Sequence, residues 1–202
     1  VHTFKLRKTY PQWKKILLAH FFQGLREGSF AFVIVVWIYI ATESELKLGT
    51  YGLISSAVSF LSYYFVGRFL KPIHRKKAIL IGGVLLYCAI FIIIFQLTYA
   101  KLIVYGIIIS IAYPLLLVPY HSITYDVIGT MWKAAEMRVE YIVLRDVFAN
   151  IGRISSILIL VLFILLFGEE EGIPIALLLL GSGHFIIYFC IRTMKQPFLT
   201  SV

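Results

Sequence analysis

The chain has few charged residues for its length, and this scarcity decides its class. Only 14% of its 202 residues are Asp, Glu, Lys or Arg, against about 25% in soluble domains. The hydrophobic residues, 60% of the total, gather in continuous runs of about 20 residues, long enough to cross a bilayer. A soluble domain is therefore excluded. The runs also lack the apolar–polar alternation of membrane β-barrels, so the sequence predicts an all-α membrane protein.

Cysteine is also scarce, which argues against a cysteine-based metal centre. Cys88 and Cys190 are the only two, and both lie inside apolar runs without the spacing of metal ligands. The acidic run 169–171 has no His or Arg nearby and is expected to be a solvated loop. We therefore predict no metal ion and no cofactor.

The net charge of +9 does not indicate nucleic-acid binding. The Lys and Arg residues lie in short loops between apolar runs, and the preference of membrane proteins for positive cytoplasmic loops accounts for them. Nucleic acid is therefore not an expected partner.

No pair of catalytic side chains is recognisable. Ser182 and His184 belong to a Gly-Ser-Gly-His run that resembles a motif of intramembrane serine proteases. Two positions apart on one helix, they point to opposite sides and form no dyad. We assign no catalytic residue and expect the chain not to be an enzyme.

Six apolar stretches organise the chain, and the short connections between them favour antiparallel neighbours. We predict spans at 16–42, 49–70, 78–97, 101–128, 138–167 and 173–193. A basic leader, 1–15, is expected before them and a tail, 194–202, after them. No cleavable signal peptide is recognisable.

The loop charges predict the orientation. Fourteen Lys or Arg fall in the leader, the tail and the two loops on the same side, whereas two, Lys47 and Lys101, fall on the opposite side. The positive side is expected to be cytoplasmic, which places both termini in the cytoplasm. We therefore expect a polytopic protein of a prokaryotic cytoplasmic membrane, in contact with the lipid bilayer.

The fifth stretch carries charges at bilayer depth. At about 100° per residue its polar residues fall on one helix face. These residues are Arg138, Arg145, Asp146, Asn150, Arg153 and Ser156. A charge in hydrocarbon costs about 3 kcal/mol or more, so such residues face a bundle interior or a wet cavity. Neighbouring helices are expected to share this face.

The first and fourth stretches have polar faces of this kind. The face of the first holds His20, Gln23, Arg26 and Glu27. Gly24 and Gly28 flank it with a small-xxx-small spacing that lets another helix approach closely. The fourth contains Pro114 and Pro119, which are expected to kink it. Around these prolines lie Tyr113, Tyr120, His121, Thr124 and Tyr125.

The remaining stretches have simpler patterns. The second carries small residues that predict a packing seam: Gly49, Gly52, Ser55, Ser56, Ser59 and Ser62. The third and sixth are apolar all round, so they are expected to face lipid.

A ten-residue motif between the second and third stretches adds a family resemblance. Residues 67–76 read Gly-Arg-Phe-Leu-Lys-Pro-Ile-His-Arg-Lys, similar to the cytoplasmic motif Gly-x-x-x-Asp-Arg-x-Gly-Arg-Lys of the major facilitator superfamily. Gly67, Arg75 and Lys76 match. Lys71 replaces the Asp, Pro72 the Arg and His74 the inner Gly, as in the weaker copy of a second half.

Three features together resemble one half of a major facilitator transporter. They are this motif, the six stretches after a basic leader, and the polar faces of the first and fourth stretches. The C-terminal half, helices seven to twelve, fits best. The resemblance implies two inverted three-helix repeats, with the first and fourth helices lining a central cavity and the third and sixth outside it. It also implies a second six-helix half as partner and a small-molecule substrate moved by alternating access, with proton coupling as a further expectation. The alternatives are an intramembrane enzyme and a non-transporting assembly or receptor module.

The candidates for a substrate or proton pathway are the polar residues of the first, fourth and fifth stretches. They are Gln23, Arg26, Glu27, Tyr113, Tyr120, His121, Arg145, Asp146, Asn150 and Arg153. Such residues serve either transport or structural ion pairing.

Three expectations concern these charges. At equal depth on their helices, Arg26 is expected to pair with Asp146, or Glu27 with Arg145. Glu27 is the first candidate for a coupling carboxylate and Asp146 the second. Arg153 is expected either to hold a substrate carboxylate or phosphate or to bond backbone carbonyls.

A second set of charges lies around the predicted cytoplasmic loops. Either it forms a cytoplasmic gate, as the resemblance implies, or it is ordinary interfacial charge. The gate candidates are Gly67, Arg68, Arg75, Lys76, Asp126, Arg138 and Glu140.

Overall fold

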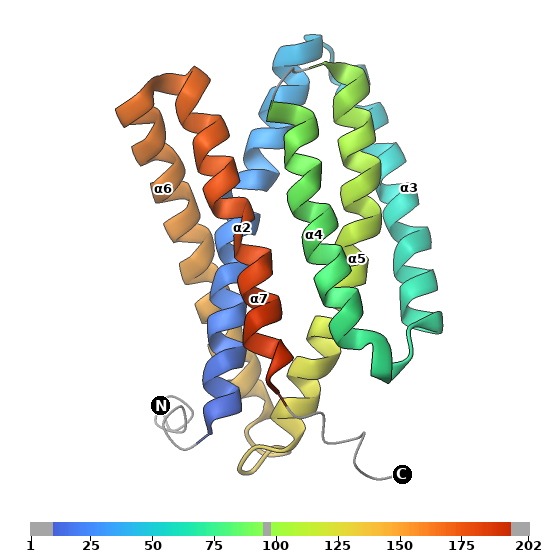
Figure 1. The fold of residues 1–202 in the computed structure, drawn as a ribbon, viewed down its shortest axis with the longest axis vertical. Coiled ribbons are helices and arrows are strands. Elements are labelled where there is room, and N and C mark those ends of the chain that lie inside the picture. The colour runs from blue at the N-terminus through green and yellow to red at the C-terminus, as the bar shows by residue number, and fades with distance from the viewer. Residues whose placement is uncertain (1–9, 95–97, 195–202) are drawn as a thin grey trace.

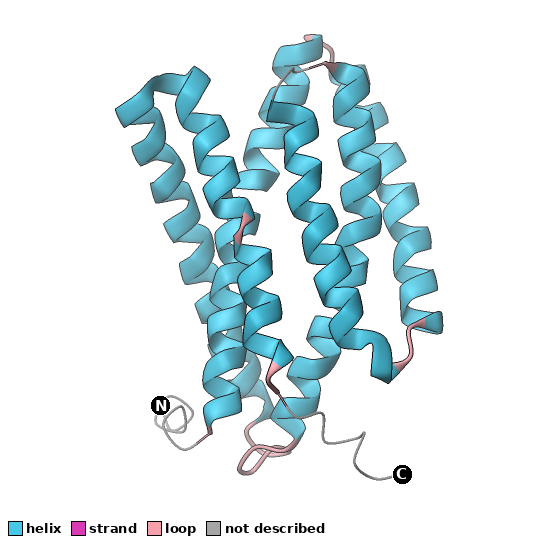
Figure 2. Cartoon of the chain, in the orientation of Figure 1, coloured by secondary structure: helices cyan, strands magenta, loops and turns pink. Residues whose placement is uncertain are grey.

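The protein is all-helical over the residues that the structure, a computed structural model, describes: 10–94 and 98–194. The helices are α2 (Pro11–Thr42), α3 (Glu45–Phe69), α4 (Arg75–Ile94), α5 (Tyr99–Gly129), α6 (Arg138–Gly181) and α7 (Gly183–Arg192), with a 3-10 turn, η1 (Pro72–His74), before α4. They form an elongated bundle (Figure 1), and Figure 2 shows no strand in the described part. The all-α prediction is confirmed. Parts of three predicted segments lie outside the described residues: 1–9 of the leader, 95–97 of the third span and 195–202 of the tail.

Helix α6 is two helices joined at Gly168. This residue has φ 77° and ψ 174°, a conformation that favours glycine, and the chain reverses there. After the reversal Gly172 packs on the backbone of Phe163 and Ile164. We therefore describe six helical segments: α2, α3, α4 and α5 as segments 1 to 4, α6 up to Phe167 as segment 5, and the rest of α6 with α7 as segment 6.

Several segment boundaries differ from the prediction by a few residues, and two of these differences affect the later argument. Helix α2 starts at Pro11 rather than at residue 16, because proline is well suited to a first helical turn. Residues 169–171, expected in a loop, are helical and exposed after the reversal. Helix α5 continues through Pro114 and Pro119, and its lower part bends in Figure 1.

The positive residues gather at one end of the bundle, which we call the basic end. Lys15 Nζ donates to Thr193 Oγ1 at 2.6 Å, and Lys76 Nζ donates to the carbonyl oxygens of Arg192 and Met194 at 2.9 and 2.6 Å. These bonds place the start of α2 beside the end of α7, so both ends of the described chain lie together (Figure 1). At the opposite end Tyr99 donates to the carbonyl of Lys47.

Four helical stretches are long and apolar enough to cross a membrane, judged by length and composition: Pro11–Thr42, Pro72–Ile94, Tyr99–Gly129 and Arg138–Arg192. The last contains segments 5 and 6. Helix α3 is not among the four. Its 25 residues are long enough, but its serines, Glu45, Lys47 and Arg68 lower its hydropathy.

Helices α2 and α6 cross in direct backbone contact. A methyl group on Gly24 would overlap the carbonyl oxygen of Ala149, and one on Gly152 would overlap that of Phe21. Beyond the crossing, the Ser29 amide donates to Ser156 Oγ at 3.0 Å, and the two hydroxyls are also hydrogen-bonded. The close approach predicted from Gly24 and Gly28 is confirmed.

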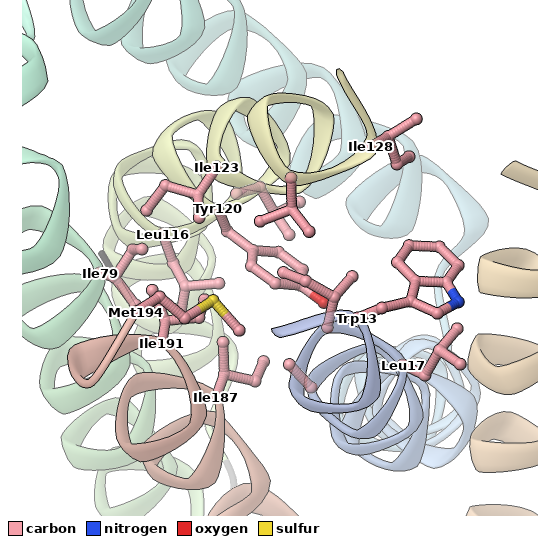
Figure 3. Close-up of a cluster of buried hydrophobic side chains, with 14 of the residues drawn as sticks. Trp13, Leu17, Ile79, Leu116, Tyr120, Ile123, Ile128, Ile187, Ile191 and Met194 are labelled. Carbon is pink, nitrogen blue, oxygen red and sulfur yellow. The ribbon is translucent and has the colours of Figure 1, made fainter. Parts of the chain in front are cut away.

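The main apolar core lies at the basic end, between α2, α4, α5 and α7. In Figure 3, Trp13 and Leu17 of α2 lie on one side, Ile187 and Ile191 of α7 on another, and the Tyr120 ring of α5 between them. This core closes the basic end. Segments 3 and 6, which are expected to face lipid, each bury one side in this core, because a helix apolar all round suits a core as well as lipid. Lipid contact of their exposed sides stays a prediction.

The packing seam predicted on α3 is wrong in part. Only Tyr51 of α3 is buried, and no other residue lies within 4 Å of a methyl group placed on Gly49 or Gly52. The glycine at this contact belongs instead to α5, where Gly106 leaves room for Tyr51 and Ser55. Most residues of α3 are therefore exposed, and the helix packs mainly against α5.

Candidate functional site

A cavity of about 820 Å³ lies between segments 1, 2, 4 and 5. Its volume falls within the usual range for sites that bind small molecules. The lining residues come from α2, α3, α5 and the first part of α6, and none comes from α4 or α7. The charged lining residues are Arg26, Glu27 and Arg153, and the aromatic ones are Phe30, Tyr51, Tyr63, Tyr105 and Tyr113.

Glu27 is the centre of the polar contacts in this cavity. Its Oε2 accepts from Arg153 Nη2 at 2.7 Å and from Nε at 3.3 Å. Its Oε1 accepts from Tyr113 OH at 2.5 Å and from Gln23 Nε2 at 2.8 Å. Three helices therefore meet at one carboxylate. Arg153 in turn donates through Nη1 to Asn150 Oδ1 at 2.8 Å.

Arg26 lies in the same cavity but lacks such partners. Its side chain is 4% exposed, and its Nε and Nη2 have no hydrogen-bond partner. The guanidinium lies over the Phe30 ring at 4.5 Å and the Tyr113 ring at 5.6 Å. No salt bridge in the described part of the chain involves it. Leaving a buried charged donor unpaired costs about 1–3 kcal/mol or more, so this arrangement needs an explanation.

A second polar cluster lies between the cavity and the basic end. Tyr120 OH and His20 Nδ1 are hydrogen-bonded, and His20 Nδ1 also contacts the Ile16 carbonyl at 2.9 Å. The His121 ring is edge-on to the His20 ring. On α6, Arg145 binds Asp146 at 2.8 Å. None of these residues lines the cavity.

A salt bridge joins α2 to α6, as expected, but the predicted partners are wrong. Glu27 pairs with Arg153 rather than with Arg145, and Arg26 does not pair with Asp146. Because α2 starts at Pro11, Glu27 lies sixteen residues after the start of its helix. Arg153 lies fifteen residues after Arg138, the start of α6, so the two side chains are at the same height. The predicted helix start was five residues late, and this shifted the register.

The role expected for Arg153 also changes. Its guanidinium is held by Glu27 and Asn150, so it is neither a free anion receptor nor bound to backbone carbonyls. Of the two arginines that line the cavity, Arg26 is the one without a salt bridge in the described part of the chain.

Some gate candidates meet and others do not. Arg75 and Asp126 form a salt bridge of 2.8 Å that joins the start of α4 to the end of α5. Lys76 bonds the carbonyls of Arg192 and Met194 at the end of α7, as described above. Among the described residues, Arg68 has one hydrogen bond, to Tyr64 at 3.4 Å. A methyl group placed on Gly67 would have no described neighbour within 4 Å. In the described chain Arg138 and Glu140 are exposed and form no salt bridge.

The contribution of α3 to the cavity was not predicted from the sequence. Tyr51, Ser55, Ser59 and Tyr63 line it, and their spacing of four residues places them on one stripe of the helix. That spacing was a readable signal. The buried His184 was not among the predicted site residues either. Both of its ring nitrogens lack a partner, and its ring lies 6.2 Å from that of Tyr113.

The chain is similar to a protein of Bacillus subtilis strain 168. It is 52% identical over 192 residues to the uncharacterized protein YqgE of that organism. The match covers 95% of the chain but 45% of the relative, so the chain spans less than half of the relative's length. No family model matches the chain, and no solved structure does.

Proposed function

We propose that the chain forms one six-helix half of a secondary active transporter of the major facilitator type, which moves a small solute across a membrane by alternating access. The observation that carries this proposal is the cavity, which holds the Glu27–Arg153 ion pair in a bundle of largely apolar helices. Its walls come from segments 1, 2, 4 and 5 and not from segments 3 and 6. This is the division that the resemblance to the superfamily implies.

The packing of the segments supports two inverted triplets. Segment 1 packs against segments 5 and 6, and segment 4 packs against segments 2 and 3. Exchanging segments 1, 2 and 3 with 4, 5 and 6 leaves this pattern unchanged. Because successive segments alternate in direction, each segment also runs opposite to its counterpart. An inverted repeat has this property.

The second half is proposed to cover the open side of the cavity. Large apolar side chains are exposed along α3 and along segment 5, which border the cavity on two sides. Examples are Leu53, Phe60, Ile154 and Leu158, which are 72%, 73%, 60% and 64% exposed. The relative is more than twice as long as the matched region, which leaves room for a second unit of similar size.

The orientation follows from the basic end. Lys15, Arg75, Lys76 and Arg192 lie there, and the positive-inside preference assigns that end to the cytoplasm. We propose an integral protein of the cytoplasmic membrane with the start of α2 and the end of α7 on the cytoplasmic side.

Alternating access predicts that the cavity opens to both sides of the membrane in turn. Ser59 lines the cavity from α3. We expect Ser59→Cys, in the full-length protein with Cys88 and Cys190 replaced by serine, to react with a membrane-impermeant maleimide added from either side. Mass spectrometry of vesicles of known orientation measures the labelling.

Two positions serve as controls for this experiment. Ala112→Cys, in the fully buried core, is expected to stay unlabelled. Glu170→Cys, exposed just after the Gly168 break, is expected to react from one side only, because α6 reverses at the end opposite the basic end. Labelling of Ser59→Cys from one side only, or from neither, contradicts alternating access. Labelling from neither side indicates the closed interior of a non-transporting assembly module.

The Arg75–Asp126 pair is proposed to hold the cytoplasmic side closed. Both side chains are about one-fifth exposed, at 22% and 23%, so breaking the pair is expected to cost about 1 kcal/mol or less. Asp126→Asn should therefore raise cytoplasmic labelling of Ser59→Cys by up to about fivefold. The charge swap Arg75→Asp with Asp126→Arg should restore the original rate. Glu136→Gln, which breaks the exposed Lys133–Glu136 pair, should leave the cytoplasmic labelling rate of Ser59→Cys unchanged. An equal rise of that rate in Glu136→Gln contradicts the gate.

A further inference from the structure

Arg26 is a buried cation without an anion of its own. Its side chain is 4% exposed, and two of its three guanidinium nitrogens, Nε and Nη2, have no partner. The faces of Phe30 and Tyr113 lie against it, and Tyr105 is beside it. Aromatic faces partly compensate a cation, but Nε and Nη2 of the guanidinium still have no hydrogen-bond partner. Proteins seldom bury such a group without pairing it.

The neighbouring carboxylate does not supply the missing charge. Glu27 is next to Arg26 in the chain, but its oxygens accept from Arg153, Tyr113 and Gln23. Of the other acids in the spans, Asp146 pairs with Arg145 and Asp126 with Arg75. Glu140 is exposed in the first turn of α6 and does not line the cavity. The cavity lining therefore holds two arginines and one glutamate, an excess of one positive charge.

The rest of the lining is largely aromatic and aliphatic. The lining includes Phe30, Tyr51, Tyr105, Ile109 and Tyr113. Of these, the Phe30 and Tyr113 rings lie against the guanidinium. A guanidinium presents a planar fork of donors that matches a carboxylate in a bidentate arrangement. The apolar walls suit an organic group rather than a hydrated inorganic ion.

We propose that the cavity binds small organic carboxylates, with the carboxylate on Arg26 and the apolar part of the molecule against the aromatic walls. This proposal rests on the transport function proposed above and names its substrate class. Glu27 with Arg153 is then free to serve coupling, whereas Arg26 serves recognition. A bound carboxylate supplies the anionic partner that Arg26 lacks among the described protein groups.

The test measures binding to the purified full-length protein in detergent. The probes are acetate, benzoate and 1-naphthoate, compared with the neutral benzyl alcohol and the cation benzylamine at constant ionic strength, because salt screens charges. The midpoint of thermal unfolding is followed against probe concentration, since a ligand that binds only the folded state raises it. We expect at least one carboxylate to stabilise the protein, and benzoate to bind more tightly than benzyl alcohol and benzylamine.

Variants assign the effect to Arg26. In Arg26→Gln the affinity for the stabilising carboxylate should fall about tenfold or more. The variant should unfold no earlier than the wild type without ligand, because it removes an unpaired buried charge. Arg26→Lys should retain a preference for anions at reduced affinity, since it keeps the charge and loses the fork. Arg145→Gln, whose guanidinium lies outside the cavity, should bind as the wild type does.

Each contrary result overturns the proposal. These results are stabilisation by none of the three carboxylates, equal or tighter binding of benzyl alcohol or benzylamine, and unchanged carboxylate binding in Arg26→Gln. The labelling of Ser59→Cys separates this failure from that of the transport function. Two-sided labelling with no carboxylate binding removes the substrate class alone, and carboxylate binding with one-sided labelling removes transport alone.

Discussion

Replacing Glu27 with glutamine is expected to abolish uptake driven by a proton gradient while the bundle stays folded. The carboxylate accepts hydrogen bonds from three side chains on three helices, so a change in its protonation alters contacts between α2, α5 and α6 together. Glutamine is similar in shape but cannot take up or release a proton. Hydrogen bonds to charged groups contribute about 1.5–3 kcal/mol each, so we expect uptake to fall by about tenfold or more.

Uptake is measured in proteoliposomes of the full-length protein with the solute that the wild type accumulates, with and without an imposed proton gradient. Glu170→Gln is the matched control, because this acid is exposed and is not one of the residues that line the cavity. Uptake by Glu27→Gln that depends on the gradient as in the wild type would remove Glu27 as the coupling residue. Adding Arg153→Gln should recover any lost stability, since it removes the charge left without its partner, but should not recover coupling.

Replacing Gly24 with valine is expected to have the largest effect on folding. Even a methyl group at this position would overlap the carbonyl oxygen of Ala149, and a backbone atom cannot move aside as a flexible side chain can. Overpacking costs about 1–3 kcal/mol and sometimes more, and a forced separation of α2 and α6 would also disturb the Ser29–Ser156 bonds. We expect Gly24→Val to lower the free energy of unfolding by an amount at or above the top of that range. Gly152→Val is expected to have a similar effect.

Thermal unfolding in detergent and the yield of monodisperse protein measure this effect. Gly129→Ala is the control, because nothing lies within 4 Å of its added methyl group. It should leave the unfolding midpoint unchanged or raise it slightly, since alanine is the better helix former. Wild-type stability of both Gly24→Val and Gly152→Val would mean that α2 and α6 do not cross in this way.

The close crossing of α2 and α6 was readable from the sequence, whereas the partners of the charges were not. The spacing of Gly24 and Gly28 depends only on the helical repeat, so it survives small errors in the helix ends. Pairing Glu27 with an arginine needs the relative height of two helices, and the early start of α2 at Pro11 shifts that height by more than one turn. The sequence therefore favoured Arg145, whereas Glu27 binds Arg153.

The part of the cavity wall that α3 forms was also only partly readable from the sequence. Its serines are recognisable as a group, but composition alone favours a packing seam. The spacing of Tyr51, Ser55, Ser59 and Tyr63 marks one stripe, and the position of α5 decides that this stripe borders the cavity. The repeat in the packing of the segments was likewise invisible in the residues, because equivalent positions in the two triplets need share only a shape.

The sequence by itself determined that the protein is helical, that its helices are apolar enough for a membrane and that its positive charges belong to one end. These properties follow from composition and local periodicity, which act within one helix. The tertiary structure alone decided that Glu27 binds Arg153 and that Arg26 stays unpaired in the cavity. Such contacts depend on how far each helix is shifted and rotated against its neighbour, and that is set by backbone packing between segments distant in the chain.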